Sequence, residues 1–169
     1  MEAISNADKS GGAVCGELPV IMCIGSDRVS GDLLGPAVGK ILVEEYNLRA
    51  YVYGVTGRNI NGENIDEYDG FIKKIHGGSV VVAVDACLGP EREIGQIKVS
   101  RCGVGAGFAV RKPGKRYGDV GVVGIVAKNS SDNVMQLLSA EYSLVEKLSR
   151  KVAEYVFGNM SELVGMAYA

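Results

Sequence analysis

Three short and almost uninterrupted apolar runs constrain the fold of this chain more than any other feature. They span residues 18–25, 79–84 and 120–127, and the second contains Val80-Val-Val-Ala-Val84. A strand that is covered on both faces reads as a continuous apolar run, whereas a half-exposed strand alternates. The runs therefore predict a largely parallel sheet with helices on both faces.

Helical patterns separate the runs. One helix is expected over 30–47, capped by Ser30 or Asp32, and a second over 65–75, ended by His76-Gly77-Gly78. A third is expected from Ser130 or Ser131 to about residue 157. Its predicted buried side chains are Val134, Leu137, Leu138, Val145, Leu148, Val152 and Val156.

Residues 51–55 and 93–101 read as further strands, the second near a sheet edge, and 103–118 reads as a loop rich in glycine and basic residues. Strands that alternate with helices imply right-handed crossovers. The expected fold class is thus α/β, a three-layer α/β/α sandwich.

The length of 169 residues favours one soluble domain. The net charge of -2 does not indicate a basic surface that would bind nucleic acid or an anionic membrane. We expect a flexible tail over 1–17, a single domain over 18–160 and a C-terminal extension over 161–169. The start of the chain lacks the basic and apolar parts of a signal peptide, so a cytoplasmic location is expected. The four cysteines show no CxxC spacing and are interpreted as reduced thiols.

Two aspartates follow apolar strands. Asp32 lies where the first strand turns into a helix, and Asp85 closes the strand that begins near Val80. The carboxyl ends of parallel strands form the edge at which such sheets bind ligands. Each aspartate also has a purely structural interpretation, since Asp32 could cap its helix and Asp85 could fix the following turn.

A pair of neighbouring carboxyls can divide acid and base roles between them. Two adjacent carboxylates do not both ionise readily, so one pKa rises and the pair shares a proton. One carboxylate, with Asp85 as the first choice, would then activate a water molecule while the other protonates a leaving group. The alternative is a divalent metal ion held by Asp32 and Asp85.

Other residues are weaker candidates for substrate binding. Asp27 and Arg28 share the loop that carries Asp32, and Gly103, Gly105 and Gly107 would allow a close backbone approach to a peptide. His76, at a predicted helix end, is the only histidine in the sequence, so a Ser-His-Asp or Cys-His site has little support.

Two segments together resemble the YyaC-type sporulation protein family. They are Ile24-Gly-Ser-Asp-Arg-Val-Ser-Gly-Asp-Leu-Leu-Gly-Pro36 and Val84-Asp-Ala-Cys-Leu-Gly89, and the likeness extends over roughly 18–155. That family is similar to the spore germination protease and, more distantly, to hydrogenase maturation endopeptidases. The implied fold is phosphorylase/hydrolase-like, with a mixed and largely parallel sheet.

The resemblance implies a sporulation-associated peptidase with Asp32 and Asp85 as its catalytic pair. It would act on a protein or peptide substrate, without a cofactor, in the cytoplasm of the mother cell or forespore. In the hydrogenase-processing relatives a later histidine completes a nickel site, but this chain has no histidine after His76. The alternatives are a non-catalytic metal- or partner-binding module of the same fold and a metal-dependent maturation endopeptidase.

Overall fold

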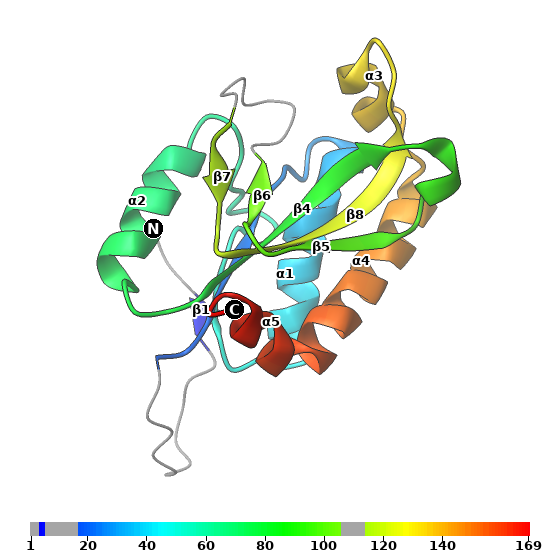
Figure 1. Ribbon diagram of the computed structural model, residues 1–169. Coiled ribbons are helices and arrows are strands. Elements are labelled where there is room, and N and C mark those ends of the chain that lie inside the picture. Colours follow the sequence, from blue (N-terminus) through cyan, green and yellow to red (C-terminus); the bar gives the residue numbers. More distant parts are fainter. Residues whose placement is uncertain (1–3, 6–16, 106–113) are drawn as a thin grey trace.

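The computed structural model describes residues 4–5, 17–105 and 114–169, and its centre is a six-stranded sheet (Figure 1). The strand order is β1-β3-β2-β4-β8-β5. The inner neighbours pair in parallel, and β1 and β5 add antiparallel edges. The strands are β1 (Ile4–Ser5), β2 (Val20–Cys23), β3 (Tyr51–Tyr53), β4 (Val81–Gly89), β5 (Ile97–Ser100) and β8 (Val120–Lys128).

Helices cover both faces of this sheet. The α-helices are α1 (Leu34–Glu44), α2 (Ile65–Ile75), α3 (Asn133–Leu138), α4 (Tyr142–Gly158) and α5 (Met160–Met166). Single 3₁₀ turns form η1 (Ser30–Leu33) and η2 (Glu91–Glu93), and a small hairpin joins β6 (Val104–Gly105) to β7 (Arg116–Tyr117). Within the part of the chain described, no helix has the length and apolarity needed to cross a membrane.

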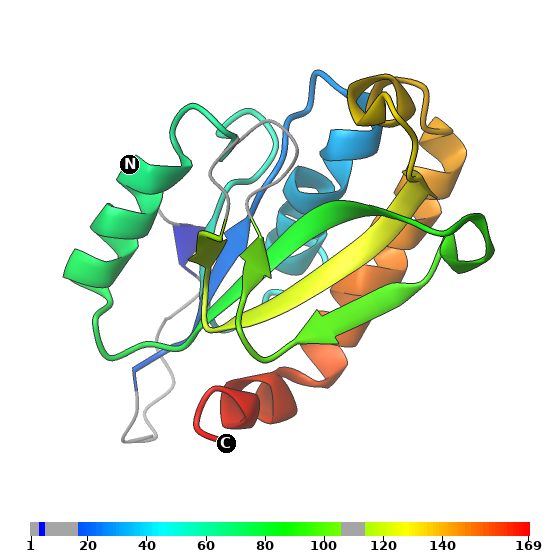
Figure 2. The ribbon, with the colours of Figure 1, turned by 45° about the horizontal axis from the view of Figure 1, so that its top comes forward.

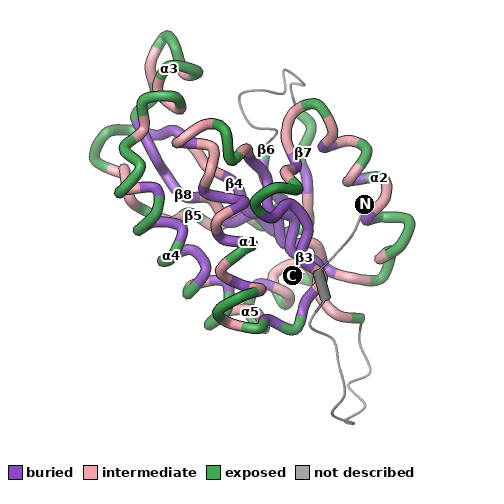
Figure 3. Tube along the Cα trace, turned by 180° about the vertical axis from the view of Figure 1, so that it is seen from behind, coloured by how far each residue is buried: buried purple, intermediate pink, exposed green. Residues whose placement is uncertain are grey.

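Alternate residues of β4 supply the two layers of the core. Val82 and Val84 belong to the cluster formed with α1, α4 and α5, whereas Ala83 packs in the cluster formed with α2 and the β6–β7 hairpin. Figures 1 and 2 show α2 and the hairpin on one side of the sheet and α1 and α4 on the other. Buried residues follow the central strands in Figure 3. The predicted three-layer α/β/α sandwich with a mixed, largely parallel sheet is confirmed.

The central strand β4 is longer than its apolar run. It continues to Gly89 because β8 pairs with it over its whole second half, as far as the pair Gly89 and Lys128. The expectation that Asp85 closes this strand is therefore wrong. Strand β2 ends at Cys23, opposite Val84, so Asp85 lies one residue beyond the carboxyl end of the neighbouring strand.

The predicted long final helix is divided in two. Asp132, rather than Ser130 or Ser131, caps α3 by accepting a hydrogen bond from the Met135 N–H at 3.0 Å. The helix stops at Ser139, whose hydroxyl donates back to the Met135 carbonyl, and α4 begins three residues later. Val134 and Leu138 were expected in the core, but they are 58% and 50% exposed.

The close approach of α1 to the chain at the end of β2 requires a glycine at position 35. A Cβ at Gly35 would lie 2.0 Å from the Ile24 carbonyl oxygen, far inside van der Waals contact. We therefore expect Gly35→Ala to lower the free energy of unfolding by about 3 kcal/mol or more, through overpacking against backbone. Urea denaturation measures this change. Gly70→Ala is the matched control, because Gly70 lies in α2 with nothing near its Cβ position, and it should stabilise by about 0.5–1 kcal/mol.

Candidate active site

The loop between β2 and η1 carries Asp32 back over the end of the sheet. Gly25 leaves the strand with φ +143°, and a Cβ there would lie 2.0 Å from the Asp32 carbonyl oxygen. The Ser26 N–H donates to that same carbonyl at 3.0 Å. The loop is thus closed on itself, and Asp32 is held beside the end of β2.

Asp32 does not cap a helix. It lies inside η1, and the residues at the cap positions of η1 and α1, Val29 and Leu33, make no side-chain cap hydrogen bond. Asp32 is partly buried, and burial raises the pKa of its carboxyl to about 6, with a small opposing effect from the Ser26 backbone. The structure therefore does not support the capping interpretation of this residue.

Asp85 is the more deeply buried member of the pair. Only 4% of it is exposed, and its Oδ1 accepts a hydrogen bond from the Ala86 N–H at 2.8 Å. Burial, and then the negative charge of Asp32, raise the pKa of Asp85 well above its ordinary value. The strand continues past it, so Asp85 does not serve to fix a turn. The charge of Asp32 thus acts on Asp85, as is expected when two carboxyls are neighbours.

Asp32 faces an open cleft of about 730 Å³. One wall is the loop from Ser26 to Val29, and the other is the loop between β3 and α2. Of the substrate-binding candidates, Asp27 and Arg28 line the cleft beside Asp32. Asp85 is not among the lining residues, so Asp32 is the member of the pair that a bound molecule would meet first.

Asp27 ties the two walls together. Its carboxylate accepts the Gly57 N–H at 2.9 Å, and its own N–H donates to Asn59 Oδ1 at 3.1 Å. Asn59 and Asn64 continue the network within the second wall, since the Asn64 side-chain amide donates to the Asn59 carbonyl at 3.1 Å. The mouth of the cleft is therefore held by hydrogen bonds between loops that are 30 residues apart.

The second wall of the cleft was not predicted from the sequence. Asn59, Asn61 and Glu63 all line it. The available signal was the Asn-Gly-Glu-Asn segment at 61–64, in which Asn61 Oδ1 accepts the Glu63 N–H and Asn64 Oδ1 accepts the Asn61 N–H. Asparagine and glycine are recognisable in a sequence as turn formers, but the position of this turn opposite Asp32 is not.

The glycine segment lies elsewhere. Gly103, with φ +67°, makes a bridge to Val120, and Gly105 ends β6. Arg116 donates to the Gly103 carbonyl at 2.8 Å and fixes this turn. Neither glycine lines the cleft that Asp32 faces, and Gly107 lies outside the described residues. A substrate-binding role for this segment stays a prediction.

The remaining chemical groups near the pair do not complete a protein-ligated metal site. Among the described residues, no three His, Cys, Asp or Glu side chains are grouped so as to hold an ion. Catalytic zinc sites, for comparison, use three protein ligands. Two carboxyls alone do not fit that pattern of three ligands.

Cys87 follows Asp85 on the same strand, but it is a poor nucleophile. Burial, and then the charge of Asp85, raise the pKa of its thiol, and the thiol lies 3.1 Å from the Leu88 carbonyl oxygen. A thiol with a raised pKa holds its proton at neutral pH, whereas cysteine catalysis uses the thiolate. Asp32 and Asp85 therefore remain the candidates for acid–base chemistry.

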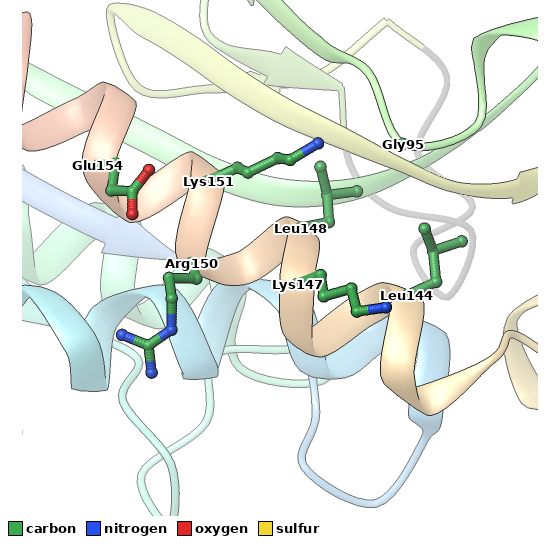
Figure 4. Close-up of a pocket in the computed structure, with 7 residues that line it drawn as sticks. All are labelled: Gly95, Leu144, Lys147, Leu148, Arg150, Lys151 and Glu154. Carbon is green, nitrogen blue, oxygen red and sulfur yellow. The ribbon is translucent and has the colours of Figure 1, made fainter.

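A second hollow, of about 290 Å³, lies between α4 and the segment around Gly95 (Figure 4). Leu144 and Leu148 give it an apolar lining with lysines around it. Arg150, at its border, is bound to Glu45 at 2.6 Å. This hollow contains neither aspartate of the pair, so it is separate from the candidate active site.

The comparisons with known proteins agree with this fold. The sequence profile of a family described as a protein of unknown function, DUF1256, matches residues 8–155. The chain belongs to this family. It is 33% identical over 135 residues to the uncharacterized protein YyaC of Bacillus subtilis (strain 168), which confirms the YyaC-type resemblance. The match covers 80% of this chain and 66% of YyaC.

Two solved structures are similar in fold. An uncharacterized protein from Wolinella succinogenes has a TM-score of 0.53 and 17% identity, and the match covers 89% of this chain and 99% of that one. A peptidyl-tRNA hydrolase from Acinetobacter baumannii has a TM-score of 0.54 and 12% identity, with 94% of this chain and 98% of that one covered. At these identities the likeness shows the α/β fold alone. The relation to the germination protease and to the hydrogenase maturation endopeptidases stays a prediction.

Proposed function

We propose that this DUF1256 protein is a hydrolase that cleaves a peptide bond with the Asp32–Asp85 pair. The observation that carries the proposal is the position of the pair. Two carboxyls with raised pKa values interact at the end of β2, and one of them lines an open cleft. Raised and interacting carboxyl pKa values are typical of acid–base sites.

The different burial of the two groups supports a division of roles between them. At neutral pH Asp32, with a pKa of about 6, is mostly ionised and faces the cleft, so it is the base that takes a proton from water. This reverses the sequence-based preference for Asp85 as the base. Asp85 is buried beside a negative charge and holds the proton of the pair.

The reaction balances without a further reactant. The water oxygen attacks the peptide carbonyl carbon while Asp32 accepts a water proton. When the carbon–nitrogen bond breaks, the pair returns one proton to the leaving nitrogen, so the products are a carboxylic acid and an amine. The Arg28 guanidinium, which also lines the cleft, would orient the substrate carbonyl.

The cellular setting follows from the resemblance to YyaC-type sporulation proteins. On that basis we propose that the protein acts in the cytoplasm of the mother cell or forespore of a spore-forming bacterium. Conditional expression of the wild-type protein and of Asp32→Asn during sporulation tests this placement.

The function is tested with a mixture of random-sequence peptides, followed by mass spectrometry. The wild-type protein should release products that carry one ¹⁸O atom in the new carboxylate when the reaction runs in H₂¹⁸O. The same reaction with EDTA should proceed at an unchanged rate. No cleavage by the wild type would contradict the proposal, and cleavage that EDTA abolishes and a divalent metal restores would favour the metal-dependent alternative.

A further inference from the structure

Exposed apolar side chains are concentrated around α3. Of the seven large apolar side chains exposed in the described part of the chain, four lie within 134–142. Val134, Met135 and Leu138 are spaced three and four residues apart around Leu138, so they share one side of α3. We call these three residues the α3 face. Figures 1 and 3 show α3 at the end of the molecule, projecting beyond the sheet.

A different side of α3 is attached to the turn that carries Asp32. Leu137 packs toward the core, and a Cβ at Gly31 would lie 2.6 Å from the Leu137 carbonyl oxygen. The Ser30 hydroxyl donates to the Ala140 carbonyl at 2.8 Å. One flank of η1 thus contacts α3, while Val29 and Asp32 line the cleft.

This attachment places the α3 face next to the candidate active site. A four-residue 3₁₀ turn is only about 8 Å long. A polypeptide segment that covers the α3 face would therefore need to extend past a single turn to enter the cleft. The helix α3 and the cleft therefore both adjoin the same short turn, η1.

The charged residues that line the cleft and flank α3 are mostly negative. Asp27, Asp32 and Glu63 line the cleft, against one cation, Arg28. Asp132 and Glu141 flank α3 at its two ends. A segment that carries both apolar and basic side chains would match this surface.

The α3 face is too small for a stable contact with a second copy of the chain. A helix of six residues is about 9 Å long, whereas stable protein–protein interfaces bury about 800 Å² on each partner. Three half-exposed side chains suit the docking of a short peptide segment.

We propose that the α3 face docks an apolar, basic segment of the protein substrate and directs the adjoining chain into the Asp32 cleft. This inference rests on the proposed peptidase function. It assigns the substrate as a protein with lysine or arginine residues next to an apolar stretch. The docking step is separate from the chemical step, so the two can be tested separately.

The test uses a displayed library of random 12-residue peptides, selected on the Asp32→Asn protein so that bound peptides are not cleaved. Selected peptides should combine apolar residues with lysine or arginine. Fluorescence polarisation should show at least 10-fold weaker binding to Met135→Ser/Leu138→Ser. Ile75→Ser is the matched control, since Ile75 is 56% exposed but lies in α2, and its affinity should stay within 2-fold.

A charge series checks the chemistry of the partner. The selected peptide should bind Met135→Glu at least 5-fold more tightly than Met135→Lys. Peptides that are acidic, or that bind the double variant as well as the wild type, would overturn the inference. A dimer seen by sedimentation velocity and dispersed by Leu138→Ser would also overturn it, by assigning the face to a second copy.

The two proposals fail in distinguishable ways. If peptides bind through the α3 face but no peptide bond is cleaved, the docking inference stands and the peptidase function does not. If Met135→Ser/Leu138→Ser cleaves the selected peptide with an unchanged KM, the peptidase function stands and the docking inference is wrong.

Discussion

Replacing Asp32 by asparagine should lower the rate of peptide hydrolysis about 10²–10⁴-fold, which is the contribution of a positioned acid or base. Asparagine has nearly the same shape but does not accept a proton from water. Because Asp32 lines the cleft and is mostly ionised at neutral pH, its loss removes the proposed base directly. Asp85→Asn should produce a loss within the same range, since the pair acts as a unit. Steady-state rates on a single cleaved peptide, measured by chromatography, give both values.

Asp69→Asn is the matched control for these variants. Asp69 is also a buried aspartate, but it lies on α2 and pairs with Lys73 at 2.8 Å, away from the candidate site. Its replacement should leave the rate within about 2-fold of the wild type, with thermal unfolding used to confirm that each variant is folded. A fully active Asp32→Asn would remove Asp32 from the mechanism.

Asp32→Asn should also stabilise the folded protein at neutral pH. The pKa of Asp32 is about 6 in the folded state, against a usual value of 3.8, so the folded state binds the proton more tightly than the unfolded state. The contribution of Asp32 to the free energy of unfolding is then fully present below pH 3.8 and is lost as pH rises through about 6. At pH 7.5 the ionised Asp32 costs about 1–3 kcal/mol, which Asp32→Asn would recover.

Urea denaturation at several pH values measures this difference. The stability advantage of Asp32→Asn over the wild type should be near zero at pH 4 and reach its full size by about pH 7.5. An advantage that is constant across this range would show that it does not arise from ionisation. A variant that is less stable at pH 7.5 would contradict the assigned burial of this carboxyl.

The layers of the fold could be predicted from the sequence because they depend on local patterns. A strand buried on both faces is recognisable from residues such as Val82 and Val84 alone, and α2 ends where the glycines after His76 indicate. The extension of β4 past Asp85 was not predictable in this way, since it depends on pairing with β8, about 40 residues later in the chain. The division of the last helix was missed because Val134 and Leu138 keep helical spacing while facing solvent.

The aspartate pair was predicted from the position of each residue after an apolar strand, and in the structure the charge of Asp32 contributes to the raised pKa of Asp85. Their division of roles could not be predicted, because it depends on burial. Asp32 reaches the cleft on η1, whereas Asp85 is enclosed within β4. The second wall of the cleft was also missed, since Asn59 meets Asp27 only through the folding of two distant loops.

Direct titration of the two carboxyls by ¹³C NMR tests the central claim, that Asp32 and Asp85 form an interacting pair with raised pKa values. We expect Asp32 to titrate near pH 6 and Asp85 well above the ordinary range of aspartate. In Asp32→Asn the pKa of Asp85 should fall, because the negative charge beside it is gone, yet stay raised by burial. Two independent titrations near pH 4, with Asp85 unchanged in the variant, would contradict the pair.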